Sequence, residues 1–238
     1  MVIVEPDMNK GILERLRSST LRKLSYDASE APDRKIIGAL DEALLVAEKV
    51  AKPRGIYRTL PVLETSKYGV KTEAGNIHSA MFTRLVNICR GDRSIVFMIA
   101  TIGEGLEITG RSSESLFHQL VFDTVGSELT EMTADMMETD WRGKLNSAGL
   151  QCCSRFSPGY CDWPLEGQDV IFKALDAGLI DVHLSPQFVI VPGKSISAIA
   201  VAAEEVPISS PCVFCAKKDC PWRRLPEDKM LMDRIKAA

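Results

Sequence analysis

Hydrophobic side chains recur every three or four residues in two long stretches of the chain, a spacing typical of amphipathic helices. The first stretch, residues 34–52, ends at Pro53, and the second covers residues 113–144. Shorter helices are expected at residues 81–89 and 165–177. In the second stretch one stripe of apolar side chains is expected to be buried: Leu116, Leu120, Val121, Val125, Leu129, Met132 and Met136.

Short β-branched or continuous apolar runs predict the strands. A strand is expected at residues 94–100, because residues 95–100 form a continuous apolar run, which is typical of a strand covered on both faces. Residues 55–63 and 70–77 are expected to be strands that pair with each other. Further strands are expected at residues 151–155, 187–191 and 195–202. Helices and strands do not alternate strictly, so the pattern predicts an α+β fold with a mixed or antiparallel sheet flanked by helices.

The composition changes twice along the chain and predicts three segments. Residues 1–33 are polar and mixed, with two short helical turns at residues 10–16 and 19–24, and we interpret them as an N-terminal arm. Residues 34–206 form the α+β domain. Residues 207–238 are rich in proline, cysteine and charge and form a Cys-rich C-terminal tail.

Overall composition and charge narrow the functional classes. The 238 residues are 45% hydrophobic and 26% charged, as in globular domains, and the formal net charge of −3 argues against a nucleic-acid partner. No apolar run approaches the roughly 20 residues of a membrane-spanning helix, and the first residues do not resemble a signal peptide. We therefore expect a cytoplasmic protein with no membrane partner, whose seven cysteines are reduced thiols or metal ligands.

Residues 155–164 read Arg-Phe-Ser-Pro-Gly-Tyr-Cys-Asp-Trp-Pro and are unusually dense in special side chains. Pro158 and Gly159 predict a tight turn with open backbone amides. The guanidinium of Arg155 suits a carboxylate, and Tyr160 offers a flat face and a hydroxyl. The segment could therefore hold a small ligand. The alternative is a structural turn between a strand and a helix, closed by an aromatic side chain.

The segment Arg-x-Ser-Pro-Gly-Tyr resembles the Arg-Pro-Ala-Pro-Gly-Tyr loop of the activation (reactivation) domain of cobalamin-dependent methionine synthase. Downstream, Val-Pro-Gly-Lys-Ser-Ile-Ser at residues 191–197 is similar to that family's Pro-Gly-x-Ser-x-Ser. Upstream, residues 128–135 resemble its long helix. The resemblance covers about residues 122–203, is weaker over residues 34–121, and departs from the family pattern at Phe156 and Ser157.

The resemblance implies a stand-alone domain that binds S-adenosylmethionine and presents its methyl group to a corrinoid held by another protein. That partner would be a corrinoid protein or the cobalamin domain of methionine synthase. A one-electron reduction of cob(II)alamin, coupled to methyl transfer from S-adenosylmethionine, would restore methylcobalamin. The electron would come from a donor such as a flavodoxin or ferredoxin. The chain would thus be an accessory part of a methyltransferase system.

Site residues follow from the resemblance. It implies that Arg155 binds the ligand's carboxylate and that Ser157 and Gly159 contact the ligand through the backbone. Tyr160, the residue assigned to catalysis, would lie between the ligand and the corrin. Glu131 would face the cationic amino or sulfonium group, with Glu128, one turn earlier, as its competitor. The family's N-terminal acidic contact has no clear counterpart here.

The C-terminal tail contains a second candidate site. Cys212, Cys215 and Cys220 include a two-residue spacing that lets two thiolates grip one metal ion. Zinc or an iron–sulfur cluster would want a fourth ligand, for which the candidates are Cys161, Cys153 and Cys152. The alternative is a set of free thiols. The methionine synthase domain lacks this tail, so the tail departs from the family pattern.

Two other functions remain open from the sequence. The chain could be a metal- or iron–sulfur-binding module for interaction or electron transfer that does not bind S-adenosylmethionine. It could also be a conventional methyltransferase on a parallel sheet. The latter predicts a glycine-rich loop near the N-terminus, which the sequence does not supply.

Overall fold

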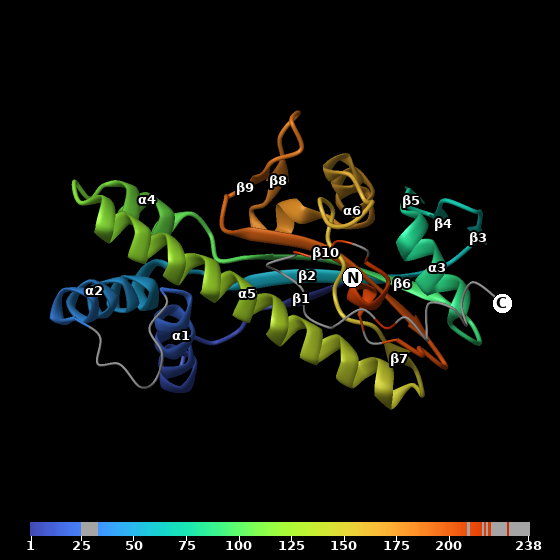
Figure 1. Ribbon diagram of the computed structural model, residues 1–238, viewed down its shortest axis with the longest axis horizontal. Coiled ribbons are helices and arrows are strands. Elements are labelled where there is room, and N and C mark those ends of the chain that lie inside the picture. Colours follow the sequence, from blue (N-terminus) through green and yellow to red (C-terminus); the bar gives the residue numbers. More distant parts are fainter. Residues whose placement is uncertain (25–32, 209, 216, 218, 220–227, 229–238) are drawn as a thin grey trace.

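The computed structural model describes residues 1–24, 33–208, 210–215, 217, 219 and 228. Its centre is a five-stranded sheet in which every neighbouring pair is antiparallel. The strands lie in the order β1 (Val2–Val4), β2 (Arg54–Pro61), β6 (Ser94–Thr101), β10 (Ser195–Ala203) and β7 (Gln151–Cys152). The sheet and its flanking helices confirm the predicted α+β class, in its antiparallel form (Figure 1).

Helices cover both faces of this sheet. The long helix α5 (Leu116–Ser147) crosses one face, and α6 (Gln168–Ala174) packs on the other. The central strand β6 is therefore buried at every position from Ile95 to Thr101, which explains its unbroken apolar run. At one end of the sheet, α1 (Lys10–Lys23), α2 (Arg34–Val50) and α4 (Gly105–Arg111) pack around the N-terminal half of α5 (Figure 1).

Small elements complete the fold at the opposite end and around the rim. α3 (Ala80–Ile88) lies near a three-stranded sheet of β3 (Glu64–Thr65), β4 (Val70–Thr72) and β5 (Gly75–Ile77) (Figure 1). β8 (His183–Leu184) and β9 (Ile190–Val191) form a hairpin. The described residues also contain three 3₁₀ turns: η1 (Leu165–Gly167), η2 (Ala177–Ile180) and η3 (Pro211–Phe214).

The predicted stripe on the long helix is only partly right. Val121, Val125 and Leu129 are fully buried, but Leu116 is 79% exposed and Leu120 is 55% exposed. The apolar face that packs against the other helices begins after the first turn of α5, so the two leading leucines point into solvent. Further along, the helix buries a different set of side chains against the sheet: Ala134, Met137 and Trp141.

Other predicted elements have mixed outcomes. The helix at residues 34–52 and the strands at 94–100 and 195–202 are confirmed. The pairing of 55–63 with 70–77 is wrong: β2 pairs with β1 and β6, whereas β4 belongs to the small sheet. The helix predicted at 165–177 is interrupted, and only its middle, α6, is α-helical.

The polar N-terminal segment contributes two elements to the structure. Residues 1–33, expected as an arm, supply the edge strand β1, which pairs with β2, and the helix α1, which packs against α2 and α5. Leu16 of α1 is fully buried in the helical cluster. No helix in the described ranges is both long and apolar enough to cross a membrane.

Candidate functional site

The loop at residues 155–164 is anchored to the core by its aromatic side chains. Phe156 forms an isolated bridge with Ile199 of β10, through backbone N···O distances of 2.8 and 2.9 Å. Its ring stacks between those of Phe82 and Trp163, with centroid distances of 5.6 and 5.5 Å. Gly167 passes so close to the Trp163 indole that a side chain there would collide with it. The loop is therefore held firmly at both ends.

Between these anchors the chain makes the predicted tight turn. The backbone N–H of Tyr160 donates to the carbonyl oxygen of Ser157 at 3.3 Å, and that of Gly159 donates to Trp163 at 2.8 Å. Gly159 has φ +87°, a left-handed conformation that favours glycine. Tyr160, at the tip of the turn, is 46% exposed. Ser157, Gly159 and Tyr160 thus share one surface turn.

Arg155 points from the start of the loop into a cluster of carboxylates on α5. Its guanidinium donates to Asp135 at 2.7 Å, to Glu131 at 2.9 Å and to Glu138 at 3.1 Å. The Arg155 side chain is only 4% exposed, while Glu131 and Asp135 are about half exposed. The two residues predicted to bind opposite ends of a ligand, Arg155 and Glu131, are therefore bound to each other.

A second arginine, Arg142, also binds one carboxylate of this cluster. Arg142 donates to Glu138 at 2.7 and 3.0 Å and to the carbonyl oxygens of Cys152 and Cys153. Burial alone would lower the pKa of the Arg155 guanidinium, but the hydrogen bond and charge of Asp135 and the other two carboxylates outweigh it and raise that pKa. Arg155 is thus a permanent cation fixed against α5.

One groove runs between α5 and the start of β10. It has a volume of about 370 Å³ and is lined on the α5 side by Glu128 and Glu131 and on the β10 side by Lys194 and Ser195. Lys194 donates to Asp123 at 2.6 Å and to Ser127 at 2.9 Å. The predicted Pro-Gly-Lys-Ser segment therefore faces the same stretch of α5 as the Arg155 cluster.

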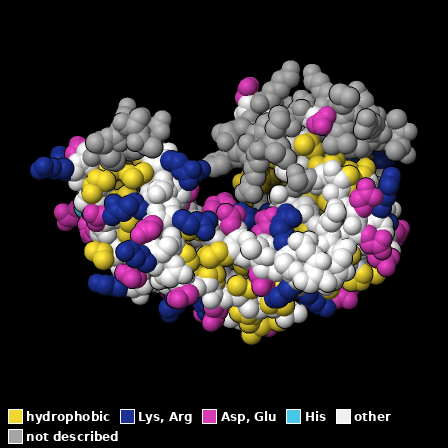
Figure 2. Space-filling view, turned by 90° about the horizontal axis from the view of Figure 1, so that it is seen from below, with side chains coloured by type: hydrophobic (Ala, Val, Ile, Leu, Met, Phe, Trp, Pro, Cys, Tyr) yellow, Lys and Arg dark blue, Asp and Glu magenta, His cyan; other side chains and the backbone are white. Residues whose placement is uncertain are grey.

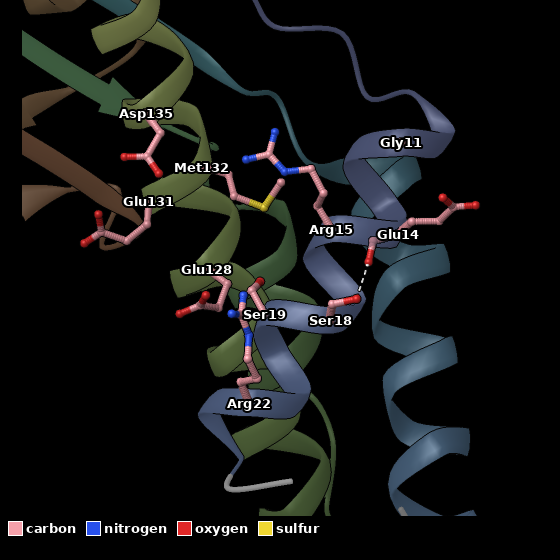
Figure 3. A pocket seen from close by; sticks show the side chains of 10 residues that line it. All are labelled: Gly11, Glu14, Arg15, Ser18, Ser19, Arg22, Glu128, Glu131, Met132 and Asp135. Atoms are coloured by element: carbon pink, nitrogen blue, oxygen red, sulfur yellow. Dashed lines mark hydrogen bonds between the residues drawn. The ribbon is translucent and has the colours of Figure 1, made fainter. Parts of the chain in front are cut away.

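A second groove, of about 430 Å³, lies between α1 and α5 (Figure 3). Arg15 and Arg22 reach from α1 toward α5, while Glu131 and Asp135 project from the side of α5 that faces away from α1. Glu131 lines both grooves and also binds Arg155, so it connects the loop to them. Figure 2 shows acidic and basic side chains gathered in the hollow on the underside of the molecule.

Sequence reasoning missed three charged residues of this region: Asp135, Glu138 and Lys194. Glu131, Asp135 and Glu138 are separated by four and three residues, a spacing that places all three on one face of a helix. That spacing, read together with Arg155, was the available signal. Glu128 is less exposed than Glu131 and lies 3.9 Å from Lys23, so the two competing glutamates have different cationic neighbours.

The predicted metal ligands lie in the C-terminal segment. Cys212 and Cys215 are described, whereas Cys220 lies outside the described residues. Across the described ranges, no three His, Cys, Asp or Glu side chains are already arranged to hold a metal ion. No disulfide forms among the described cysteines.

Comparison with known proteins identifies the fold. No family model matches the sequence, and no curated protein matches it significantly. A solved structure described as the MetH reactivation domain bound to AdoHcy is similar, with a TM-score of 0.59 over 84% of this chain and 78% of that chain. Sequence identity is 14%, so the likeness concerns the fold. The chain has a reactivation-domain-like α+β fold.

Proposed function

We propose that this protein binds S-adenosylmethionine along α5 and supports reductive methylation of cob(II)alamin on a corrinoid-dependent methyltransferase such as methionine synthase. The observation that carries the proposal is the Arg155–Glu131 ion pair at the edge of two grooves. The proposal is also supported by the similar fold of a reactivation domain that was crystallised with AdoHcy. When bound, S-adenosylmethionine supplies the methyl group.

The residues around the ion pair suit a zwitterionic ligand. Arg155 would hold the ligand's carboxylate, because its fork makes two parallel hydrogen bonds to such a group. Glu131, released from Arg155, would hold the ammonium or sulfonium group. The exchange gives Arg155 and Glu131 each a new partner of opposite charge, and Arg155, whose side chain is only 4% exposed, is already desolvated. Asp135 and Glu138 would keep Arg155 in place throughout.

The exposed turn supplies the remaining contacts. Ser157 and Gly159 would contact the ligand through their backbone groups. The exposed ring of Tyr160 would lie between the ligand and a corrinoid carried by a partner protein. In this arrangement the electron and the corrinoid both arrive on other proteins, so the chain acts as an accessory component.

Isothermal titration with S-adenosylmethionine tests the proposal. We expect Glu131→Gln to weaken binding about tenfold or more, because a hydrogen bond to a charged group is worth about 1.5–3 kcal/mol. Glu205→Gln, a surface glutamate paired with Arg90 far from the grooves in sequence, is the control. Methylthioadenosine, which lacks the amino-acid group, should bind the wild type and Glu131→Gln equally. Absence of saturable binding to the wild type would overturn the proposal.

A further inference from the structure

The start of α5 and the neighbouring helix α4 carry exposed apolar side chains that the proposed function does not use. Leu116 and Leu120 of α5 are exposed, and so is Ile108 of α4. The two leucines are four residues apart on one helix, so they form a single apolar ridge along α5. Figure 1 shows α4 beside the start of α5, at the end of the molecule opposite α3. Contiguous exposed apolar side chains commonly mark a site of protein contact.

A groove of about 360 Å³ lies between α4 and α5, directly beside this ridge. Leu116 and Leu120 line it on the α5 side. Two buried side chains, Leu106 of α4 and Phe122 of α5, also line it. Gly110 lets the two helices approach closely, because a Cβ atom there would lie 2.7 Å from the Phe122 Cβ. The surface therefore combines a projecting apolar ridge with an adjacent recess that is partly apolar.

The two ends of the groove carry opposite exposed charges. Arg111 ends α4, and only residues 112–115 separate it from Leu116. Asp123 lies two turns further along α5, on the same face as the leucines. Both residues line the groove, and their side chains are 78% and 65% exposed. They pair within the chain with Glu107 and Lys194, but this exposure leaves donor and acceptor positions for a second partner.

We propose that two copies of this chain associate through this surface, with their α5 helices antiparallel about a two-fold axis. A two-fold interface must complement itself. The leucine ridge of each copy lies in the recess of the other, and Arg111 of each copy meets Asp123 of the partner subunit. Opposite charges at the two ends of one apolar surface are matched when that surface is rotated onto itself, which favours a second copy over an unrelated helix. The proposal does not depend on S-adenosylmethionine binding.

The extent of the ridge determines the expected strength of the dimer. The ridge spans only the first two turns of α5, and the same face continues with the polar residues Asp123 and Ser127. Small interfaces are typical of transient association. We therefore expect a dimer in concentration-dependent equilibrium with the monomer. In dilute solution the monomer predominates, and Leu116 and Leu120 then contribute little to the free energy of unfolding.

Sedimentation velocity of the full-length protein over a wide range of concentrations tests the dimer. We expect Leu120→Asp to weaken dimerisation at least about tenfold, because each interface would then bury two unpaired carboxylates against leucine. Leu63→Asp is the matched control, since Leu63 is 58% exposed but lies outside α4 and α5, and it should dimerise like the wild type. A wild type that is monomeric at every concentration, or a Leu120→Asp variant that dimerises like it, would overturn the proposal.

A charge exchange tests the antiparallel arrangement. Arg111→Glu alone brings two carboxylates together at each end of the interface, and Asp123→Lys alone brings two cations together, so each variant should dimerise less than the wild type. An equimolar mixture restores both ion pairs, and we expect its heterodimer to form about as readily as the wild-type dimer. A mixture that dimerises no better than either variant alone would overturn the arrangement. Circular dichroism of each variant separates loss of association from loss of folding.

Discussion

The two halves of α5 belong to different parts of the core. The N-terminal half packs against α1, α2 and α4 through side chains such as Val125 and Leu129. The C-terminal half covers the central sheet through Met137 and Trp141. One continuous helix therefore changes its partners, and the side of the helix that it buries, near its middle.

The grooves and the Arg155 cluster lie at this change of partners. Glu128, Glu131 and Asp135 occupy the stretch between the two hydrophobic clusters, where neither α1 nor the sheet fully covers the helix. Partly exposed carboxylates are tolerated there because they are paired or reach water. A helix that packs against two separate hydrophobic clusters therefore leaves charged, accessible side chains between them, and these are suited to binding a polar ligand.

Truncation of Trp141, the largest buried side chain in the C-terminal half of α5, should have the greatest effect on stability. Trp141 is 1% exposed and meets the ring of Tyr57 edge-on at 5.9 Å. We expect Trp141→Ala to lower the free energy of unfolding by about 4 kcal/mol, because large-to-small changes in a core leave a cavity. Denaturant unfolding followed by circular dichroism measures the loss. A loss below about 1 kcal/mol, typical of surface changes, would show that this half is not tightly packed.

Two leucines in the N-terminal half of α5 allow a buried position to be compared with an exposed one. Leu129 is fully buried, and we expect Leu129→Ala to cost about 3 kcal/mol. Leu116, on the same helix and of the same size, is mostly exposed, so Leu116→Ala should change stability by less than about 0.5 kcal/mol. Equal losses for the two variants would contradict the burial of α5 described above.

Arg155→Met tests how much the Arg155 carboxylate cluster, which lies between the two halves of α5, contributes to stability. The substitution removes the ion pairs of Arg155 with Glu131, Asp135 and Glu138. Glu138 keeps its ion pair with Arg142. Breaking a buried ion pair costs about 3–5 kcal/mol, and because two of these carboxylates are half exposed we expect about 2 kcal/mol. Arg90→Met, which removes an exposed arginine paired with Glu205, is the control and should be nearly neutral. An Arg155→Met protein as stable as this control would mean that the cluster adds no net stability.

The smallest effect on stability is expected for Asp140, in the C-terminal half of α5. The hydrogen bond from Lys144, opposed by burial and assisted by the Tyr57 hydroxyl, lowers the pKa of Asp140. A folded-state pKa below the unfolded value stabilises the fold above the unfolded pKa of about 3.9, and this stabilisation is lost as the pH falls through the folded value. The melting temperatures of wild type and Asp140→Asn should therefore differ at neutral pH and converge in acid.

Asp169→Asn is the control for this pH dependence. Asp169 also pairs with a lysine four residues later, Lys173, but both side chains are more than half exposed. Exposed pairs of this kind contribute little. We expect the difference from wild type to be small at every pH. A pH-dependent difference as large as that of Asp140→Asn would assign the effect to the helical spacing rather than to Tyr57.

The sequence by itself determined the local elements and the chemistry that they carry. The three-and-four spacing predicted the helix at 34–52, the apolar run predicted the strand at 94–100, and the density of special residues singled out the loop that begins at Arg155. These features depend on neighbours within a few residues, because helix periodicity and turn geometry are set by local backbone contacts.

Only the tertiary structure decided which distant residues meet. It paired Arg155 with carboxylates 17 to 24 residues away and left Leu116 exposed. A helix of 32 residues with two buried faces has no single apolar stripe to read. The partners of α5 depend on the order of strands in the sheet and on which elements cover each face of the sheet. Hydrophobic periodicity does not encode this order, because it describes only the residues within one helix or strand.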